Sequence, residues 1–116
     1  MSLFAGVGGI DLGLEAAGRS LGIPVEIVAQ AEINRHSQAV LRRHWPGIRL
    51  WFDITELPAR HVPDCDLIAF GSPCQALSTI GKRGGLADSS SSGLFYEVVR
   101  IMKELRREGR QPRWAL

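Results

Sequence analysis

The stretch from Asp66 to Ser78 constrains this chain more than any other, because it joins an apolar run to a sharp break. Residues Leu67 to Phe70 are apolar and predict a short buried strand. Gly71 and Pro73 then end the strand, since neither residue fits the interior of a hydrogen-bonded ladder. Cys74 therefore follows the carboxyl end of a strand, where open α/β sheets hold their ligands.

A cysteine at such a turn can be partly exposed and close to helix N-termini, and both conditions favour a reactive thiolate. The alternative is a buried structural cysteine, which is the commoner fate of a lone Cys. The second cysteine, Cys65, precedes the same strand. The strand would hold the two cysteines roughly 17 Å apart, whereas a disulfide needs Cα atoms within about 7 Å. We therefore predict two free thiols, with Cys65 filling space at the edge of the strand.

A glycine-rich turn opens the chain. Residues 3–4 read as the end of a strand, and Gly6, Gly8 and Gly9 let the backbone turn tightly and approach a ligand closely. A helix should follow, closed by Gly18 as its C-terminal cap. A nicotinamide dinucleotide fingerprint would need glycine at position 11, where Asp11 stands. That substitution argues against a nicotinamide-dependent oxidoreductase.

A second strand is predicted from Val25 to Ala31, after Pro24. Glu32 falls at its end, about 20 residues beyond the glycine turn, as in dinucleotide-binding βαβ units. A carboxylate at this place suits a ribose diol, because it accepts hydrogen bonds from both hydroxyls. The alternative is a solvated surface glutamate.

Residues 35–45 predict a helix with Asn34 as its N-cap. Its core-facing stripe is expected to be Val40, Leu41, His44 and Trp45. A third strand is expected over residues 48–52, followed by Asp53 as a turn or cap residue. The three histidines show no metal-ligand spacing, so we expect no metal.

Three glycines and a run of serines over residues 79–92 read as a flexible segment. Gly93 should begin the last helix, whose core positions are Val98, Ile101, Met102 and Leu105. The basic residues between them are expected to form a solvated face; they are Arg100, Lys103, Arg106 and Arg107. Residues 113–116 resemble the start of another strand.

The bulk properties fit one small soluble domain. The chain has 116 residues, a formal net charge of +2 and 45% hydrophobic residues. It contains no apolar run of the roughly 20 residues that a membrane span needs. Its start also lacks the basic and long apolar regions of a signal peptide, so we expect a cytoplasmic location.

The motif Gly71-Ser-Pro-Cys-Gln75, with Leu77-Ser78, resembles the catalytic motif of the DNA cytosine-5 methyltransferases. Phe4-Ala-Gly-x-Gly-Gly9 is similar to the S-adenosylmethionine loop of that family. The resemblance covers essentially the whole chain. It implies a doubly wound, Rossmann-like α/β fold, of which residues 1–116 would be the N-terminal half, and a role such as restriction-modification in a prokaryote or phage.

The resemblance also implies the site residues. Cys74 would be the covalent nucleophile, with Pro73 and Gln75 in the same catalytic motif. Glu32 would bind the cofactor ribose, Ile33 would pack on the adenine, and Asp53 would bond its amino group. The full cofactor set would be Phe4, Ala5, Gly6, Gly8, Gly9, Ile10, Glu32, Ile33, Asp53, Ile54 and Leu94. Double-stranded DNA would be contacted by Ser78, Lys82 and Arg83.

In the implied mechanism, the Cys74 thiolate adds to cytosine C6, so that C5 can attack the sulfonium methyl group. The target base must first leave the duplex to reach the thiol. Three departures qualify the match: the first strand is nearly missing, Ser91 stands where the family has an arginine, and the Glu-Asn-Val motif and target-recognition region are absent. We therefore expect a truncated or split form, with a second polypeptide supplying the rest. A non-catalytic remnant that binds cofactor or a partner is the alternative.

Overall fold

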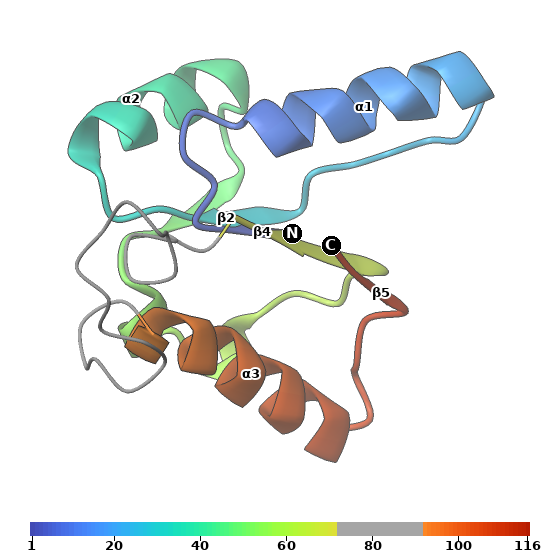
Figure 1. Ribbon diagram of the computed structural model, residues 1–116. Helices are drawn as coiled ribbons and strands as arrows, with labels where there is room; N and C mark the ends of the chain where they lie inside the picture. The colour runs from blue at the N-terminus through green and yellow to red at the C-terminus, as the bar shows by residue number, and fades with distance from the viewer. Residues whose placement is uncertain (72–91) are drawn as a thin grey trace, which may run out of the picture.

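The computed structural model describes residues 1–71 and 92–116. In these residues five parallel strands form one sheet in the order β3-β2-β1-β4-β5 (Figure 1). The strands are β1 (Ser2–Leu3), β2 (Ala29–Ala31), β3 (Arg49–Trp51), β4 (Leu67–Phe70) and β5 (Trp114–Ala115). The first strand, β1, lies in the middle of the sheet. The strands β2 and β3 follow on one side of it, and β4 and β5 on the other. This order confirms the predicted doubly wound, Rossmann-like fold.

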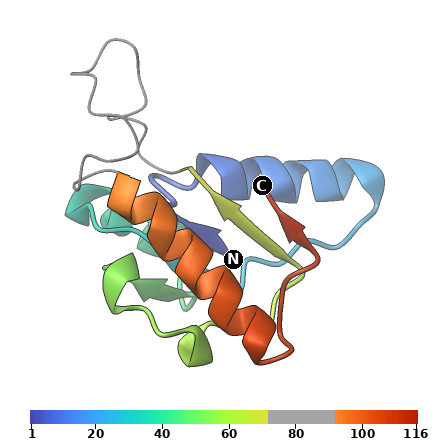
Figure 2. The same cartoon turned by 60° about the horizontal axis from the view of Figure 1, so that its bottom comes forward.

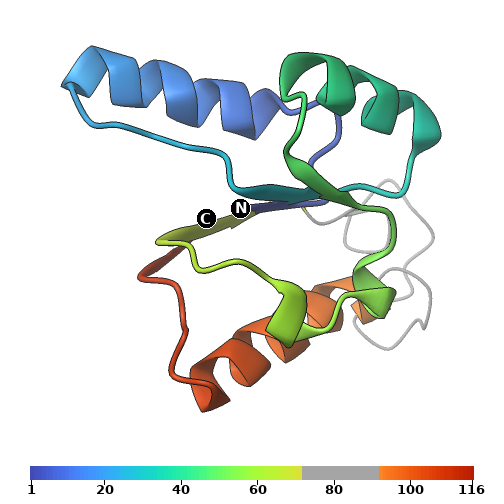
Figure 3. The ribbon, with the colours of Figure 1, turned by 180° about the vertical axis from the view of Figure 1, so that it is seen from behind.

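Helices cover both faces of the sheet. The helix α1 (Gly9–Leu21) and the helix α2 (Arg35–His44) lie on one face, and α3 (Ser92–Arg107) lies on the other (Figures 1 and 3). Two 3-10 helices, η1 (Ile54–Glu56) and η2 (Ala59–His61), join α3 on its side. The main core fills the space between the sheet and α3, which crosses the strands (Figure 2).

The central strand β1 is only two residues long, as the sequence predicted, yet the backbone around it is well bonded. The carbonyl oxygen of Met1 accepts a hydrogen bond from the Ala69 N–H at 3.0 Å, and the Ala5 N–H donates to the Ala31 carbonyl at 3.0 Å. The amino terminus itself donates to the carbonyl of Leu67 at 3.0 Å. Residues on either side of β1 therefore extend its bonding to both neighbouring strands.

The predicted end of the first helix is wrong. Helix α1 continues past Gly18 to Leu21, and its C-cap is Gly22, which has the left-handed φ of 68°. Gly18 is instead buried inside the helix, where a β-carbon would lie 2.6 Å from the carbonyl oxygen of Ile23 and 2.6 Å from Val25. The glycine is needed because the returning chain packs against the helix at that point, which local sequence does not reveal.

The second strand is shorter than predicted, and one helix position faces the other way. Only Ala29–Ala31 pair as β2, because no neighbouring strand reaches residues 25–28. Asn34 caps α2 as expected, with its side chain accepting hydrogen bonds from the backbone N–H groups of residues 36 and 37. Leu41 is fully buried, but His44 is exposed and does not belong to the core-facing stripe.

The last helix confirms its predicted core and, at Lys103, Arg106 and Arg107, its solvated basic face. Val98, Ile101 and Leu105 are fully buried, and Met102 packs against the same cluster. Arg100, however, turns inward and binds protein groups, as described below. Helix propensity and periodicity place a residue on a face, but they do not show which carbonyl groups a long side chain will find there.

Candidate functional site

A cleft of about 430 Å³ opens at the carboxyl edge of the sheet. It lies where the ends of β1, β2, β3 and β4 meet the first turn of α3, the place where parallel α/β sheets hold their ligands. Ten residues line it: Phe4, Ala31, Glu32, Ile33, Asn34, Phe52, Asp53, Ile54, Gly71 and Leu94. Its walls are mostly apolar, with two carboxylates among them, as is usual for a small-molecule site.

The glycine turn after β1 adopts a backbone that few other sequences allow. Phe4, Gly6 and Gly8 have positive φ angles of 53°, 57° and 85°. The ring of Trp45 lies so close to Gly8 that a β-carbon there would be 2.4 Å away. Trp45 is itself fixed, because its indole N–H donates to Glu15 Oε1 at 2.8 Å. The tight turn leads directly into α1, whose first residue is Gly9.

Glu32 ties this turn to the next strand. Its Oε2 accepts a hydrogen bond from the Gly6 N–H at 2.8 Å, and its Oε1 accepts one from the Asn34 N–H at 2.7 Å. Each carboxylate oxygen has two lone pairs, so both oxygens keep capacity for one further donor. A half-buried carboxylate held in this way can accept the two hydroxyls of a ribose diol.

Asp53 occupies the same position at the end of the neighbouring strand. Its Oδ1 accepts hydrogen bonds from the Thr55 N–H at 2.8 Å and from the Thr55 hydroxyl at 2.7 Å. These two bonds fix the side chain as the cap of η1 and leave Oδ2 for another donor. The amino group of a base is such a donor.

The cleft brings together six of the residues predicted to bind the cofactor, which are Phe4, Glu32, Ile33, Asp53, Ile54 and Leu94. The remaining five, Ala5, Gly6, Gly8, Gly9 and Ile10, form the turn and the start of α1 beside it. Of these, Gly6 reaches the site through its bond to Glu32. Phe52 and Asn34 line the cleft but were not predicted.

The catalytic and DNA-contacting residues lie outside the described part of the chain. These are Pro73, Cys74, Gln75, Ser78, Lys82 and Arg83, all within residues 72–91. Gly71, the last described residue before that segment, and Leu94, shortly after it, both line the cleft.

The comparisons with known proteins decide the family. The family model described as "C-5 cytosine-specific DNA methylase" matches residues 1–114. The chain belongs to this family. It is 38% identical over 116 residues to the type II methyltransferase M2.BsuMI of Bacillus subtilis, which covers all of this chain and 27% of that relative. It is 37% identical over 109 residues to M.NgoBV of Neisseria gonorrhoeae, covering 94% of this chain and 26% of the relative.

Solved structures of similar proteins agree with the sequence relatives. A DNMT2 variant from Spodoptera frugiperda superposes with a TM-score of 0.62 at 27% identity, over 90% of this chain and 31% of the other. The S. pombe Dnmt2 methyltransferase gives 0.60 at 25% identity, over 88% and 30%. The chain thus spans between a quarter and a third of the length of these relatives.

Two structural features of the chain were not predicted from its sequence. Asp11 is 1% exposed, and its Oδ2 accepts hydrogen bonds from the Ser2 hydroxyl at 2.8 Å and from the Gln30 amide at 2.7 Å. This carboxylate therefore links α1 to both β1 and β2, beneath the glycine turn. A polar residue in the first turn of a helix is an ordinary surface pattern, so nothing in the sequence marked it as buried.

The second feature is the side chain of Arg100. Its guanidinium donates to the carbonyl oxygens of Ile54 and Leu57 at 3.1 and 3.0 Å, and it forms ion pairs with Glu97 at 2.7 Å and Glu104 at 3.2 Å. Arg100 thereby holds η1, and with it the chain next to Asp53, against α3. This arginine supports one wall of the cleft.

Two features are missing from the part of the chain that the structure describes. No group of three or more His, Cys, Asp or Glu side chains is arranged to hold a metal ion there. None of the helices in residues 1–71 and 92–116 combines the length and the apolar character needed to cross a membrane.

Proposed function

We propose that this chain is the cofactor-binding and nucleophile-bearing part of an enzyme that methylates C5 of cytosine in DNA. S-adenosylmethionine is the proposed methyl donor, and Cys74 the proposed nucleophile. The observation that carries the proposal is Glu32, whose carboxylate is fixed by Gly6 and Asn34 at the mouth of an apolar cleft. Membership of the methylase family supports the same reading.

The residues of the cleft fit S-adenosylmethionine. The volume of about 430 Å³ lies within the range of small-molecule pockets. Glu32 would accept the ribose hydroxyls, and Asp53 the amino group of the adenine. Ile33 and Ile54 supply apolar surface for the base, and Leu94 supplies it from the opposite side of the sheet. Gly6 and Gly9 let the backbone come close to the ligand, because they carry no side chain and the space where a β-carbon would stand is open.

Covalent geometry supports Cys74 as the neighbour of this cleft. Three residues span at most about 11 Å of extended chain, and Gly71, three residues before Cys74, lines the cleft. The proposed thiolate attacks C6 of the cytosine, and the electron pair of the C5–C6 double bond becomes available at C5. When bound, S-adenosylmethionine supplies a methyl group that C5 can take up. Loss of the C5 proton then returns the electron pair, and the thiolate leaves C6.

The proposed DNA contacts follow the same segment of the chain. Lys82 and Arg83 would meet backbone phosphates, and Ser78 would lie beside the target nucleotide. The target cytosine would be flipped out of the duplex to reach the thiolate. Because DNA is the substrate, we place the enzyme in the cytoplasm of a bacterial or phage-infected cell. Bacterial and phage relatives support this location.

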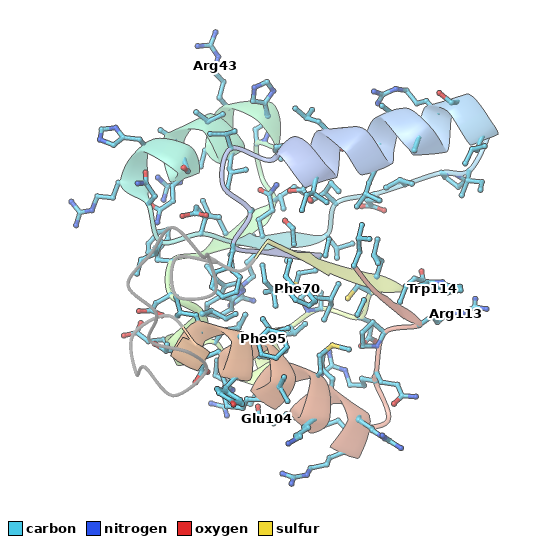
Figure 4. All side chains as sticks on the ribbon, in the orientation of Figure 1. Arg43, Phe70, Phe95, Glu104, Arg113 and Trp114 are labelled. Atoms are coloured by element: carbon cyan, nitrogen blue, oxygen red, sulfur yellow. The ribbon has the colours of Figure 1, made fainter. Side chains whose placement is uncertain are left out.

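We further propose that residues 1–116 are one portion of the catalytic domain, completed by polypeptide that carries the Glu-Asn-Val motif and the target-recognition region. The strand β5 supports this, because it forms one edge of the described sheet. Trp114 in β5 and Leu116 just after it are 67% and 63% exposed, and Figure 4 labels Trp114. A neighbouring hollow of about 330 Å³ between β5 and α3 is lined by Phe70 and Phe95. An added strand and helix would cover both.

The test is transfer of labelled methyl groups to duplex DNA. We expect the 116-residue chain alone to show no useful rate, because one missing electrostatic contact to the reacting base costs about 10²–10³ in rate. Adding a polypeptide with the missing motif and recognition region should restore transfer. Cys74→Ser should abolish it, whereas Cys65→Ser should retain it.

The outcomes separate the proposal from its alternative. Cofactor binding without transfer, even with the added polypeptide, would favour a non-catalytic remnant. Robust transfer by the chain alone that disappears in Cys74→Ser would show that the added parts are dispensable. Transfer that survives Cys74→Ser would overturn the assignment of the nucleophile.

A further inference from the structure

Phe52 is an exposed aromatic ring at the cleft that the proposed function leaves unused. It follows β3 directly, it lines the cleft, and it is 53% exposed. A single exposed apolar side chain is common on a protein surface, but Phe52 also lines the ligand cleft, so its ring is placed to contact what the cleft binds.

One charged side chain of the described residues packs against the ring. The guanidinium of Arg42 lies 5.3 Å from the centroid of the Phe52 ring, within the range of a cation–π contact. The preceding residue, Trp51, stacks on His61 of η2, on the α3 side of the sheet. Alternation along the strand sends Phe52 to the opposite side, toward α2, beneath which β3 runs (Figure 3). Arg42 therefore covers one ring face. In residues 1–71 and 92–116 no second cationic or aromatic side chain stacks on this ring, and the ring lines the cleft, where a flat ligand can meet it.

The position of Phe52 among the cleft residues indicates what that ligand is. Strands β2 and β3 pair in register with Ala31 opposite Trp51, so Glu32 stands beside Phe52. The Glu32 N–H donates to the Trp51 carbonyl at 2.9 Å, which fixes this alignment. Asp53 is the next residue along the chain. Phe52 thus neighbours both the residue proposed for the ribose and the one proposed for the amino group of the base.

We propose that Phe52 is a further cofactor-binding residue whose other ring face stacks on the adenine ring, with Arg42 as the positioning residue behind it. The inference rests on the proposed function, since it assigns a new wall to the same site. Ile33, which follows the neighbouring strand β2 and is 69% exposed, forms the aliphatic counterpart of this wall. Stacking on an aromatic side chain tolerates any flat base, so Phe52 supplies affinity and Asp53 supplies the choice of base.

The test is calorimetric titration of the 116-residue chain and its variants with S-adenosylhomocysteine. We expect Phe52→Ala to raise the dissociation constant about tenfold, as expected for one lost base–aromatic stack. Phe52→Leu, which keeps apolar bulk but has no π face, should lose nearly as much, and Phe52→Trp should bind at least as tightly as wild type. Arg42→Ala should weaken binding two- to threefold, and Arg42→Lys should restore it.

Tyr96→Ala is the matched control, because Tyr96 is an aromatic residue of similar exposure, 56%, and does not line the cleft. It should leave the dissociation constant unchanged. Melting temperatures of all variants show whether they are folded. A Phe52→Ala protein that melts like wild type and binds equally well overturns the inference, as does full affinity in Phe52→Leu. If Glu32→Ala still abolishes binding in that case, the proposed function stands. If the wild-type chain binds no S-adenosylhomocysteine, both the proposed function and the inference on Phe52 are overturned.

Discussion

The indole ring of Trp45 fills the space beside Gly8 so closely that a β-carbon at position 8 would lie 2.4 Å from it. The contact joins the end of α2 to the turn before α1, two segments that are far apart in the sequence. Because the φ angle of Gly8 is 85°, the turn needs glycine for two independent reasons, backbone conformation and lack of space.

Two glycine substitutions should therefore have opposite effects on stability. Gly8→Ala should lower the free energy of unfolding by at least about 2 kcal/mol, since it adds left-handed strain to a steric clash. Gly13→Ala should raise it by about 0.5–1 kcal/mol, because position 13 is inside α1 and a β-carbon there meets nothing. Urea unfolding followed by circular dichroism measures both. Equal effects of the two substitutions would show that the Trp45 contact does not exist in solution.

Removing the Glu32 carboxylate should weaken cofactor binding far more than it weakens folding. Glu32→Ala deprives the ligand of its ribose acceptor and frees the Gly6 N–H, so we expect the affinity for S-adenosylmethionine to fall at least tenfold. Glu26→Ala, at an exposed glutamate outside the cleft, is the control and should change nothing. Isothermal titration calorimetry reports both. Equal heats for the Glu32 variant and wild type would exclude Glu32 from the site.

Arg100 should matter for stability although a neighbouring cation does not. Arg100→Met removes the donors to the carbonyl oxygens of Ile54 and Leu57, and the arginine side chain is 31% exposed. After allowance for solvent screening we expect a loss of about 1–2 kcal/mol in unfolding free energy. Lys103→Met, on an exposed position of the same helix, should cost less than about 0.5 kcal/mol. Equal melting temperatures for the two variants would contradict the role of Arg100 in holding η1 against α3.

The two thiols should react at different rates, with Cys65 the slower. Burial raises the pKa of the Cys65 thiol above its ordinary value, and the carboxylates of Asp66 and Asp64 act in the same direction, against the lowering effect of the amino terminus. At pH 8 Cys65 is therefore mostly protonated, and its alkylation rate should increase as the pH rises toward the raised pKa. Iodoacetamide labelling with peptide mass mapping follows each site. Faster labelling of Cys65 than of Cys74 would count against Cys74 as the nucleophile.

Local chemistry accounts for the parts of the fold that sequence analysis predicted well. The run Leu67–Phe70 became β4 with the same bounds, because an apolar run between breakers has few alternatives. Asn34 caps α2 through its own side chain, which is a contact within three residues. Glu32 was found from its distance to the glycine turn, which the βαβ unit fixes.

The errors concern contacts between distant segments. Gly18 was mistaken for a helix end, and it is a packing position against residues 23–25. Arg100 was assigned to a solvated face, but its guanidinium donates to the carbonyl oxygens of Ile54 and Leu57, in and just after η1. Phe52 was read only as the end of a strand, and Arg42 holds its ring at the cleft. Each of these depends on which segment folds back against which, and a linear pattern does not contain that information.

The sequence by itself determined the alternation of strands and helices, the glycine turn, the acidic residue after the second strand and the Pro-Cys motif, because each follows from local backbone preference and spacing. The tertiary structure decided how these parts meet. It buried Asp11 of α1 against β1 and β2, tied Glu32 to Gly6, and set Phe52 beside Glu32 at the cleft. Those contacts arise only when parallel strands align in register, because the alignment brings the ends of β1, β2 and β3 to one edge of the sheet.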